Sequence, residues 1–231
     1  MKPRPLLILG MHRSGTSCLT GQLEEAGVWL GEVHRSSVHN AKGNRENPEI
    51  MALNEAVLVD NGSRWNQPPD GPVHWATARL AERDRILAAY PSDRVWGFKD
   101  PRTLFTLDAW RDALPDARFV GTIRHPLAVA RSLNARSRMP VEMGFALWTR
   151  YNARLLRIAQ REECPILSFD VPAPHYIAAT VRLIESLGLA FPSTNQVFFD
   201  ESLRHQAADS DIELPRDVAT LYAALCERVA P

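Results

Sequence analysis

The feature that most constrains the fold of this chain is a short apolar segment that leads directly into a glycine-rich loop. Residues 5–9 (Pro-Leu-Leu-Ile-Leu) precede Gly10-Met-His-Arg-Ser-Gly-Thr-Ser17, and apolar or small side chains then recur at helical spacing as far as Ala26. An uninterrupted apolar run is typical of a buried parallel strand. The order strand, tight loop, helix therefore predicts an anion site, because the backbone N–H groups at the start of a helix attract negative charge.

The rest of the chain continues this alternation of strands and helices. The polar segments 28–47 and 62–73 are expected to be loops, and 194–210 an irregular segment. Apolar runs and helical periodicity predict strands at 95–98, 118–123 and 165–169, and helices from Pro48 and at 76–90, 103–114, 126–136, 141–161, 172–187 and 214–229. We therefore predict a single α/β domain over residues 1–231, with a P-loop NTPase-like three-layer fold in which helices flank a central parallel sheet.

Composition and charge exclude several functional classes. The 27 lysines and arginines balance 27 aspartates and glutamates, so the chain does not resemble a general polyanion binder and no nucleic acid is expected as a partner. The apolar run at 6–9 is too short to span a membrane or to form a signal peptide. The three cysteines, Cys18, Cys164 and Cys226, lack the spacing of a metal site. We therefore expect no metal, free thiols and a cytoplasmic location.

The glycine-rich loop has the spacing of a P-loop but differs from it at one important position. A nucleoside triphosphatase has a lysine where this chain has Thr16, because an ammonium group must reach the β- and γ-phosphates. Here the positive charge lies three residues earlier, at Arg13, and the loop offers the hydroxyls of Thr16 and Ser17. The missing lysine argues against ATP or GTP hydrolysis. The simplest alternative is a glycine turn with an incidental arginine.

An arginine directly before Ser-Gly-Thr resembles the 5′-phosphosulfate loop of the sulfotransferase family. These enzymes move a sulfuryl group from 3′-phosphoadenosine-5′-phosphosulfate (PAPS) to a hydroxyl or amine and release adenosine-3′,5′-bisphosphate (PAP). The resemblance implies that Thr16 and Ser17 hold the 5′-phosphate and that Arg13 offsets charge on the bridging oxygen. Ser14 and Gly15 belong to the same donor-binding loop. The terminal sulfuryl group carries less charge than a γ-phosphoryl group, so the resemblance also implies that no metal ion is needed.

A second anion site is predicted at the end of the strand 118–123. Arg124 follows this strand, Pro126 is a natural first residue of the next helix, and Ser132 lies further along it. Ligands of open α/β sheets bind at the carboxyl ends of strands, and the guanidinium fork suits phosphate oxygens. The spacing of Arg124 and Ser132 resembles the 3′-phosphate site of sulfotransferases. Taken alone, the pair is also explained by a strand-capping arginine and a helix serine bonded to its own backbone. Arg136 is interpreted as a solvated helix charge.

The segment Trp96-Gly-Phe-Lys-Asp-Pro-Arg102 ends another predicted strand. Lys99 closes this strand and is expected to face the crevice at the sheet edge. The Lys-Asp-Pro sequence resembles that of tyrosylprotein sulfotransferases and of many bacterial sulfotransferase-like proteins, which implies that Lys99 lies near the transferring group. Asp100 precedes a proline and is interpreted as a helix N-cap. Arg102 is expected to meet either an acidic acceptor or solvent.

Transfer of a sulfuryl group needs a general base for the proton of the acceptor hydroxyl. The segment 40–48 resembles the Gly-x-x-Glu segment before the second helix of bacterial members, which makes Glu46 the first candidate. Glu32, His34 and His39 are alternatives in the same loop. Glu46 is also explained as a charge that favours a helix N-terminus.

Four ring-bearing side chains are assigned other roles. His12 is expected to contribute only its backbone to the glycine-rich loop. Trp65 either lines an acceptor pocket or anchors its own loop. Trp148 and Tyr151 lie on the helix 141–161 and are expected in the core.

The sequence thus predicts a metal-independent sulfotransferase that uses PAPS, with Glu46, Lys99 and Arg13 as catalytic residues. The acceptor is a hydroxyl-bearing molecule, and a carbohydrate, a lipid head group, a peptide and a small metabolite all stay open. Two other functions stay open as well. One is a P-loop kinase or nucleotide hydrolase in which Lys99 replaces the missing lysine, and the other is a module that binds a nucleotide or a partner without catalysis.

Overall fold

A four-stranded parallel sheet forms the centre of the molecule. The computed structural model describes residues 4–36, 43–190 and 212–230 of the 231-residue chain. Neighbouring strands pair in the order β2-β1-β3-β4, and Leu6 lies opposite both Gly97 and Arg118. The strands are β1 (Leu6–Leu9), β2 (Gly97–Lys99), β3 (Arg118–Ile123) and β4 (Ile166–Ser168). The predicted parallel sheet is therefore confirmed, with β2 beginning and ending slightly later in the chain than expected.

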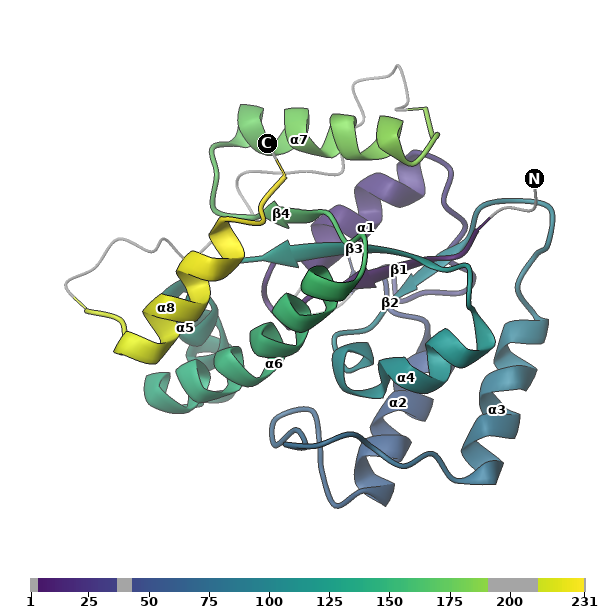
Figure 1. Cartoon of the computed structure of the whole chain (residues 1–231), viewed down its shortest axis with the longest axis horizontal. Helices are drawn as coiled ribbons and strands as arrows, with labels where there is room; N and C mark the ends of the chain where they lie inside the picture. The colour runs from purple at the N-terminus through teal and green to yellow at the C-terminus, as the bar shows by residue number, and fades with distance from the viewer. Residues whose placement is uncertain (1–3, 37–42, 191–211, 231) are drawn as a thin grey trace.

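Helices cover both faces of this sheet, so the three-layer α/β fold is confirmed (Figure 1). Leu6 and Ile8 pack on α1 and α7, whereas Leu7 and Leu9 pack into a larger cluster with the remaining helices. This alternation follows from the strand geometry, which directs successive side chains to opposite faces. The helices are α1 (Thr16–Glu25), α2 (Pro48–Asp60), α3 (Thr77–Ala88), α4 (Thr103–Ala113), α5 (Pro126–Ser137), α6 (Val141–Arg161), α7 (Ala173–Ser186) and α8 (Arg216–Cys226).

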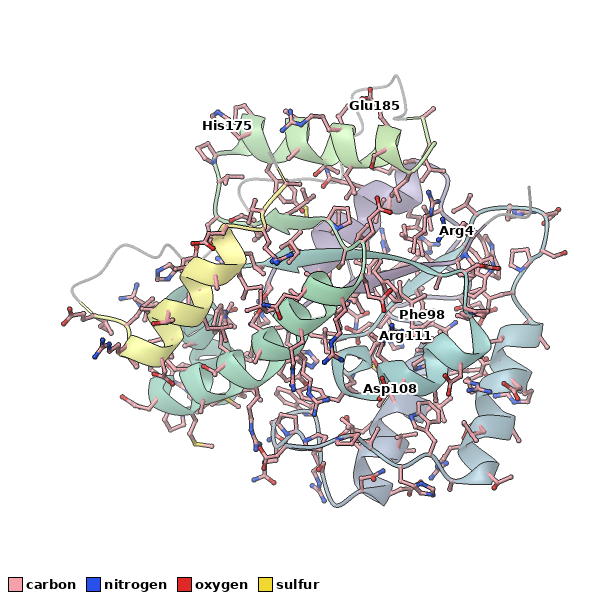
Figure 2. The ribbon with its side chains drawn as sticks, viewed as in Figure 1. Arg4, Phe98, Asp108, Arg111, His175 and Glu185 are labelled. Atoms are coloured by element: carbon pink, nitrogen blue, oxygen red, sulfur yellow. The ribbon has the colours of Figure 1, made fainter. Side chains whose placement is uncertain are left out.

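The larger apolar cluster fills the space between the sheet and the α2, α4, α5 and α6 layer. Phe98 projects from β2 toward α4 (Figure 2), where its ring lies 4.9 Å from that of Trp110. The expected core positions of α6 are buried, Trp148 and Tyr151 among them. On the other side of the sheet, His175 and Glu185 project outward from α7 (Figure 2).

Proline and asparagine set the start of the helix that follows the first long loop. The Asn47 side chain accepts hydrogen bonds from the backbone N–H groups of Glu49 and Ile50, and Pro48 occupies the first helical position. An N-cap side chain satisfies amides that have no partner inside the helix. The cap therefore holds the end of the loop, which contains Glu46, at a defined distance from the sheet.

The four strands all end at one edge of the sheet, where the predicted site residues gather. The glycine-rich loop follows β1, Lys99 ends β2, Arg124 follows β3 and Phe169 follows β4. The carboxyl edge of an open parallel sheet is the usual place for a ligand, because the loops that leave the strands diverge there.

Candidate functional site

The glycine-rich loop packs so closely on its surroundings that two of its positions require glycine. A Cβ atom on Gly10 would lie 2.7 Å from the carbonyl oxygen of Thr122, and one on Gly15 would lie 2.4 Å from the ring of Phe169. Both glycines also have positive φ angles, of 152° and 82°, which side chains disfavour. Thr122 Oγ1 donates a hydrogen bond to the carbonyl of Ser14 over 3.0 Å. The loop is thus held against β3 and the end of β4.

A cavity of about 250 Å³ opens beside this loop. It collects side chains from the loop, the end of segment 28–47, the end of β2 and α5. Of the predicted site residues, Arg13, Thr16, Ser17, Glu46 and Lys99 line this cavity, whereas Ser14, Gly15, Arg124 and Ser132 do not. The complete lining is His12, Arg13, Thr16, Ser17, Asn44, Glu46, Met51, Trp65, Lys99, Pro101, Arg102 and Arg136.

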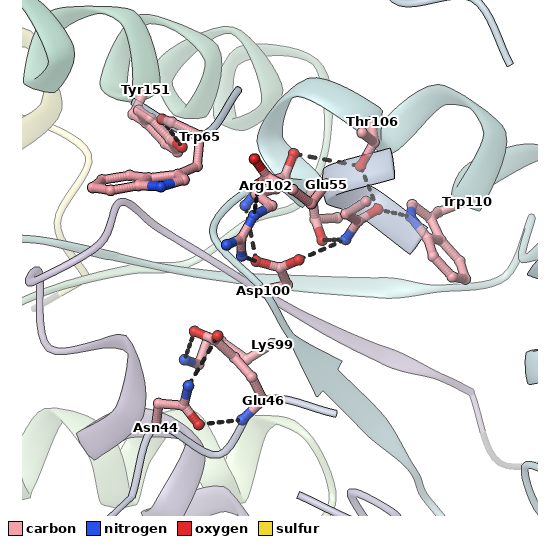
Figure 3. A network of polar contacts seen from close by, with 12 residues as sticks. Asn44, Glu46, Glu55, Trp65, Lys99, Asp100, Arg102, Thr106, Trp110 and Tyr151 are labelled. Atoms are coloured by element: carbon pink, nitrogen blue, oxygen red, sulfur yellow. Dashed lines mark hydrogen bonds and ion pairs between the residues drawn. The ribbon is translucent and has the colours of Figure 1, made fainter. Parts of the chain in front are cut away.

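Glu46 and Lys99 form a buried ion pair in the wall of the cavity (Figure 3). Lys99 Nζ lies 2.7 Å from Glu46 Oε1, and the two side chains are only 1% and 8% exposed. The other carboxylate oxygen of Glu46 accepts a hydrogen bond from Asn44 Nδ2 over 3.0 Å. Removing either charged partner from such a buried pair leaves the other charge without compensation, which is costly for the fold.

Asn44 is a site residue that the sequence interpretation missed. Its Oδ1 accepts a hydrogen bond from the backbone N–H of Glu46, while its Nδ2 binds the Glu46 carboxylate. Asparagine commonly bonds the backbone two residues further on, so the Asn-x-Glu spacing was a usable signal. The backbone of Asn44 also accepts a hydrogen bond from Ser17 Oγ over 3.1 Å, which ties the glycine-rich loop to the segment that carries Glu46.

Arg102 and Asp100 belong to a polar network that the sequence interpretation missed. The guanidinium group of Arg102 pairs with Glu55 and, over 2.8 Å, with Asp100 Oδ1 (Figure 3). Arg102 also lines the cavity, and its contact with an acceptor stays a prediction. Asp100 caps the start of this helical segment, as expected: its Oδ1 accepts a hydrogen bond from the backbone N–H of Arg102 over 3.2 Å, and Pro101 lies between them, although α4 itself begins at Thr103. The other carboxylate oxygen of Asp100 accepts a hydrogen bond from the buried Asn54 on α2. A polar residue inside the apolar stripe of α2 was the sequence signal for this network.

The second predicted anion site, Arg124 and Ser132, adjoins the glycine-rich loop through Arg13. Arg13 Nε donates a hydrogen bond to Ser132 Oγ over 2.8 Å, and Arg124 Nη1 donates one to the carbonyl of Arg13 over 3.3 Å. The Arg124 guanidinium lies 5.5 Å from the centre of the Phe169 ring, and its Nε lies 3.9 Å from a carboxylate oxygen of Asp170. Arg13 therefore connects the pair Arg124 and Ser132 to the cavity, a contact that the sequence did not indicate.

The alternative bases lie away from this cavity. Glu32 and His34 are exposed and do not line it, and His39 lies outside the described residues. The backbone of His34 instead pairs with Glu46 and Arg45. Among the candidate bases in the described part of loop 28–47, Glu46 alone lines the cavity.

Trp65 anchors its own loop, one of the two roles considered for it, and it also lines the cavity. Its carbonyl accepts a hydrogen bond from Tyr151 Oη over 2.7 Å, so the loop is anchored on α6 (Figure 3). Arg136 is exposed, as expected of a solvated charge, but it also lines the cavity. Its position one turn after Ser132 on α5 places both on one side of that helix.

His12 also lines the cavity, in contrast to the expectation that only its backbone matters. Burial, reinforced by the charges of Arg102, Lys99, Arg136 and Arg13, lowers the pKa of His12 well below its ordinary value. The imidazole is therefore neutral, because protonation would add a further charge to a cationic, poorly solvated environment. The same burial lowers the pKa of Arg13, which stays charged because arginine does not lose its proton in proteins.

The fold and this site define the class of protein. The chain has a P-loop-type α/β fold. Its first loop and the segment that follows β3 supply arginines and hydroxyls, the side chains that bind phosphate and sulfate groups. In the described part of the chain, no group of three or more His, Cys, Asp or Glu side chains could hold a metal ion, and no helix is long and apolar enough to cross a membrane.

Comparison with known proteins then identifies the family. Residues 5–193 match the model of the sulfotransferase family, and the chain belongs to this family. No curated protein matches the chain. Solved structures with the same fold include the sulfotransferase domain of the Synechococcus PCC 7002 olefin synthase, at 17% identity and a TM-score of 0.60 over 97% of this chain and 95% of that one. They also include the sulfotransferase domain from the curacin biosynthetic pathway, at 15% identity and a TM-score of 0.59 over 99% of both chains. A sulfotransferase from Alicyclobacillus acidocaldarius is 15% identical with a TM-score of 0.53, over 98% and 94% of the two chains.

Proposed function

We propose that this chain transfers the sulfuryl group of PAPS to a hydroxyl group of an acceptor, without a metal ion. The observation that carries this proposal is the single cavity in which Arg13, Thr16 and Ser17 of the glycine-rich loop face the ion pair of Glu46 and Lys99. Family membership supports sulfuryl transfer in general. The same membership favours this function over a kinase, a nucleotide hydrolase or a non-catalytic module.

The residues of the site suit the two charged ends of PAPS. Two groups of anion-binding side chains lie near each other: the hydroxyls of Thr16 and Ser17, and the pair Arg124 and Ser132. Arg13 connects them. The first group would hold the 5′-phosphate, together with the backbone of Ser14 and Gly15, since the Ser14 side chain is buried away from the cavity. The second would hold the 3′-phosphate. The close packing of Gly10 and Gly15 keeps the loop free of side chains that would fill this cradle.

In the proposed reaction the acceptor oxygen attacks sulfur as the bond between sulfur and the bridging oxygen breaks. The acceptor proton passes to Glu46, and PAP leaves with the electron pair on its phosphate oxygen. Protonation of Glu46 removes the charge that compensates Lys99, 2.7 Å away. The freed ammonium charge, with that of Arg13, then stabilises the negative charge that develops on the leaving phosphate.

The acceptor stays a hydroxyl-bearing molecule of unassigned class, with a carbohydrate, a lipid head group, a peptide and a small metabolite as candidates. Cys18, Cys164 and Cys226 are free thiols, which supports a reducing compartment such as the cytoplasm.

Calorimetry with PAP, the spent donor, against ATP with magnesium tests this proposal. We expect PAP to bind, and Arg124→Ala to weaken PAP binding at least tenfold, because a buried charge-assisted contact to phosphate is lost. Arg131→Ala serves as the matched control, since Arg131 lies on the neighbouring helix α5 and does not line the cavity. Preferential binding of ATP with magnesium, or binding of neither nucleotide, would overturn the proposal.

A further inference from the structure

The His12 side chain carries a polar atom that the folded chain leaves without a partner. Its Nε2 is buried, and no hydrogen-bond partner lies within reach in the described part of the chain. Buried polar atoms of this kind are rare and costly, and they point to a ligand or water that completes them. The His12 side chain lines the cavity shared by Thr16, Glu46 and Lys99, so the missing partner is expected there.

Two aromatic residues hold the imidazole in a fixed orientation. The ring of His12 meets the rings of Trp65 and Tyr151 edge-on, with centroid distances of 5.0 and 5.6 Å. Tyr151 is fully buried and bonded to the carbonyl of Trp65, so the three rings form one rigid unit. A side chain held in this way is preorganised for a directional contact.

Cations approach His12 from several elements, and they keep it neutral. Arg13 belongs to the same loop as His12, Lys99 ends β2, Arg102 follows that strand, and Arg136 lies on α5. Burial first, and then these charges, lower the pKa of His12. Glu46, the carboxylate in the cavity lining, is bonded to Lys99 instead. A neutral imidazole offers one N–H donor to a ligand without becoming a further ion.

We propose that His12 is a catalytic residue whose Nε2–H donates a hydrogen bond to a sulfuryl oxygen of the bound donor. This inference rests on the proposed function. A sulfuryl group that extends from the hydroxyls of Thr16 and Ser17 toward Glu46 must pass through the cavity that His12 lines. Sulfuryl oxygens share one charge between them and are weak acceptors, so a fixed, directional donor orients them for in-line attack.

Two substitutions separate the hydrogen bond from the packing of the ring. His12→Phe keeps an aromatic ring against Trp65 and Tyr151 but has no N–H group, whereas His12→Gln places an amide donor near the position of Nε2. His175→Phe is the matched control, because His175 is exposed on the outer face of α7 (Figure 2). PAP affinity, which depends on Arg124 under the proposed function, reports whether each variant is folded.

The experiment compares PAP with PAPS, because the two nucleotides differ only by the sulfuryl group. In ¹⁵N-histidine NMR spectra we expect PAPS, and not PAP, to move the Nε2 resonance that is missing from His12→Phe. We also expect His12→Phe to bind PAP within twofold of wild type and to lower PAPS turnover, with water as acceptor, by about 10- to 100-fold. His12→Gln should recover part of this loss, and His175→Phe should show none.

The possible failures are distinguishable. If PAP does not bind the wild-type chain, the proposed function fails and this inference fails with it. If PAP binds but PAPS and PAP move the His12 resonance equally, or His12→Phe turns over PAPS at the wild-type rate, the inference is wrong while the proposed function stands.

Discussion

At the scale of single residues, the buried pair of Glu46 and Lys99 is better explained by chemistry than by stability. Burying two charges costs more solvation than their attraction returns in many proteins, so an apolar pair would serve the fold as well. The proposed catalytic role explains the pair, because Glu46 becomes neutral when it accepts the acceptor proton. The positive charge of Lys99 can then stabilise the leaving group. Asn44 contributes to this arrangement, because it donates one hydrogen bond to the Glu46 carboxylate and accepts another from the Glu46 backbone N–H.

The first prediction concerns Glu46 itself. Glu46→Gln keeps the shape of the side chain and an oxygen that can accept from Lys99, but it removes the proton acceptor. We expect PAP release from PAPS, measured with water and with model alcohols as acceptors, to fall by about 100-fold or more, while PAP affinity stays within a few-fold of wild type. Glu32→Gln provides the control, because Glu32 is exposed outside the cavity. A loss of activity in Glu32→Gln with none in Glu46→Gln would show that the base is assigned to the wrong residue.

At the scale of secondary-structure elements, the start of α2 determines where Glu46 lies. The Asn47 side chain caps the helix by accepting hydrogen bonds from Glu49 and Ile50, over 2.9 and 3.2 Å. Glu46 is the residue immediately before the cap, and Pro48 prevents the helix from beginning earlier. A local capping arrangement therefore helps to place Glu46, together with its ion pair to Lys99 and the backbone hydrogen bond from His34.

The second prediction follows from this cap. Asn47→Ala removes the acceptor for both amides and should lower the free energy of unfolding by about 1 kcal/mol, measured by urea denaturation. PAPS turnover should fall as well, because the segment that carries Glu46 loses its anchor. Asn47→Asp keeps the capping oxygen and should retain most of the stability. Equal losses of stability in the two variants would mean that the contact of Asn47 Nδ2 with Tyr90, and not the cap, dominates.

At the scale of the whole molecule, the sequence predicts the elements better than the contacts between them. The apolar runs and the glycine-rich loop indicate the parallel sheet and its carboxyl edge, and that edge brings Arg13, Lys99 and Arg124 together. The hydrogen bond from Arg13 to Ser132 joins residues 119 positions apart. Such a contact depends on how side chains of α5 meet the first loop, which periodicity does not encode.

The same limit explains the errors at the site. The sequence left an acidic acceptor and solvent as partners for Arg102, yet its guanidinium group pairs with Glu55 of α2, 47 positions earlier in the chain, and with the neighbouring Asp100. Whether a polar side chain meets solvent or a partner is decided by long-range packing, whereas a strand or a helix start is decided by adjacent residues. That residues 1–231 form a single domain stays a prediction.

The last prediction tests how tightly the sheet edge is packed. Gly15 precedes α1 with a φ of 82°, and a Cβ atom there would lie 2.4 Å from the ring of Phe169, which follows β4. Gly62 has a similar φ of 66° but nothing within 4 Å of its Cβ position. Gly62→Ala should therefore lower the free energy of unfolding by about 1 kcal/mol, from backbone strain alone. Gly15→Ala adds a steric clash with Phe169 and should lower the free energy of unfolding by about 3 kcal/mol or more. Because Arg124 lies over the same ring, Gly15→Ala should also weaken PAP binding, and Gly62→Ala should not. If both variants lose the same free energy of unfolding in urea denaturation, the Phe169 ring moves aside freely, and the glycine-rich loop is not packed rigidly against the end of β4.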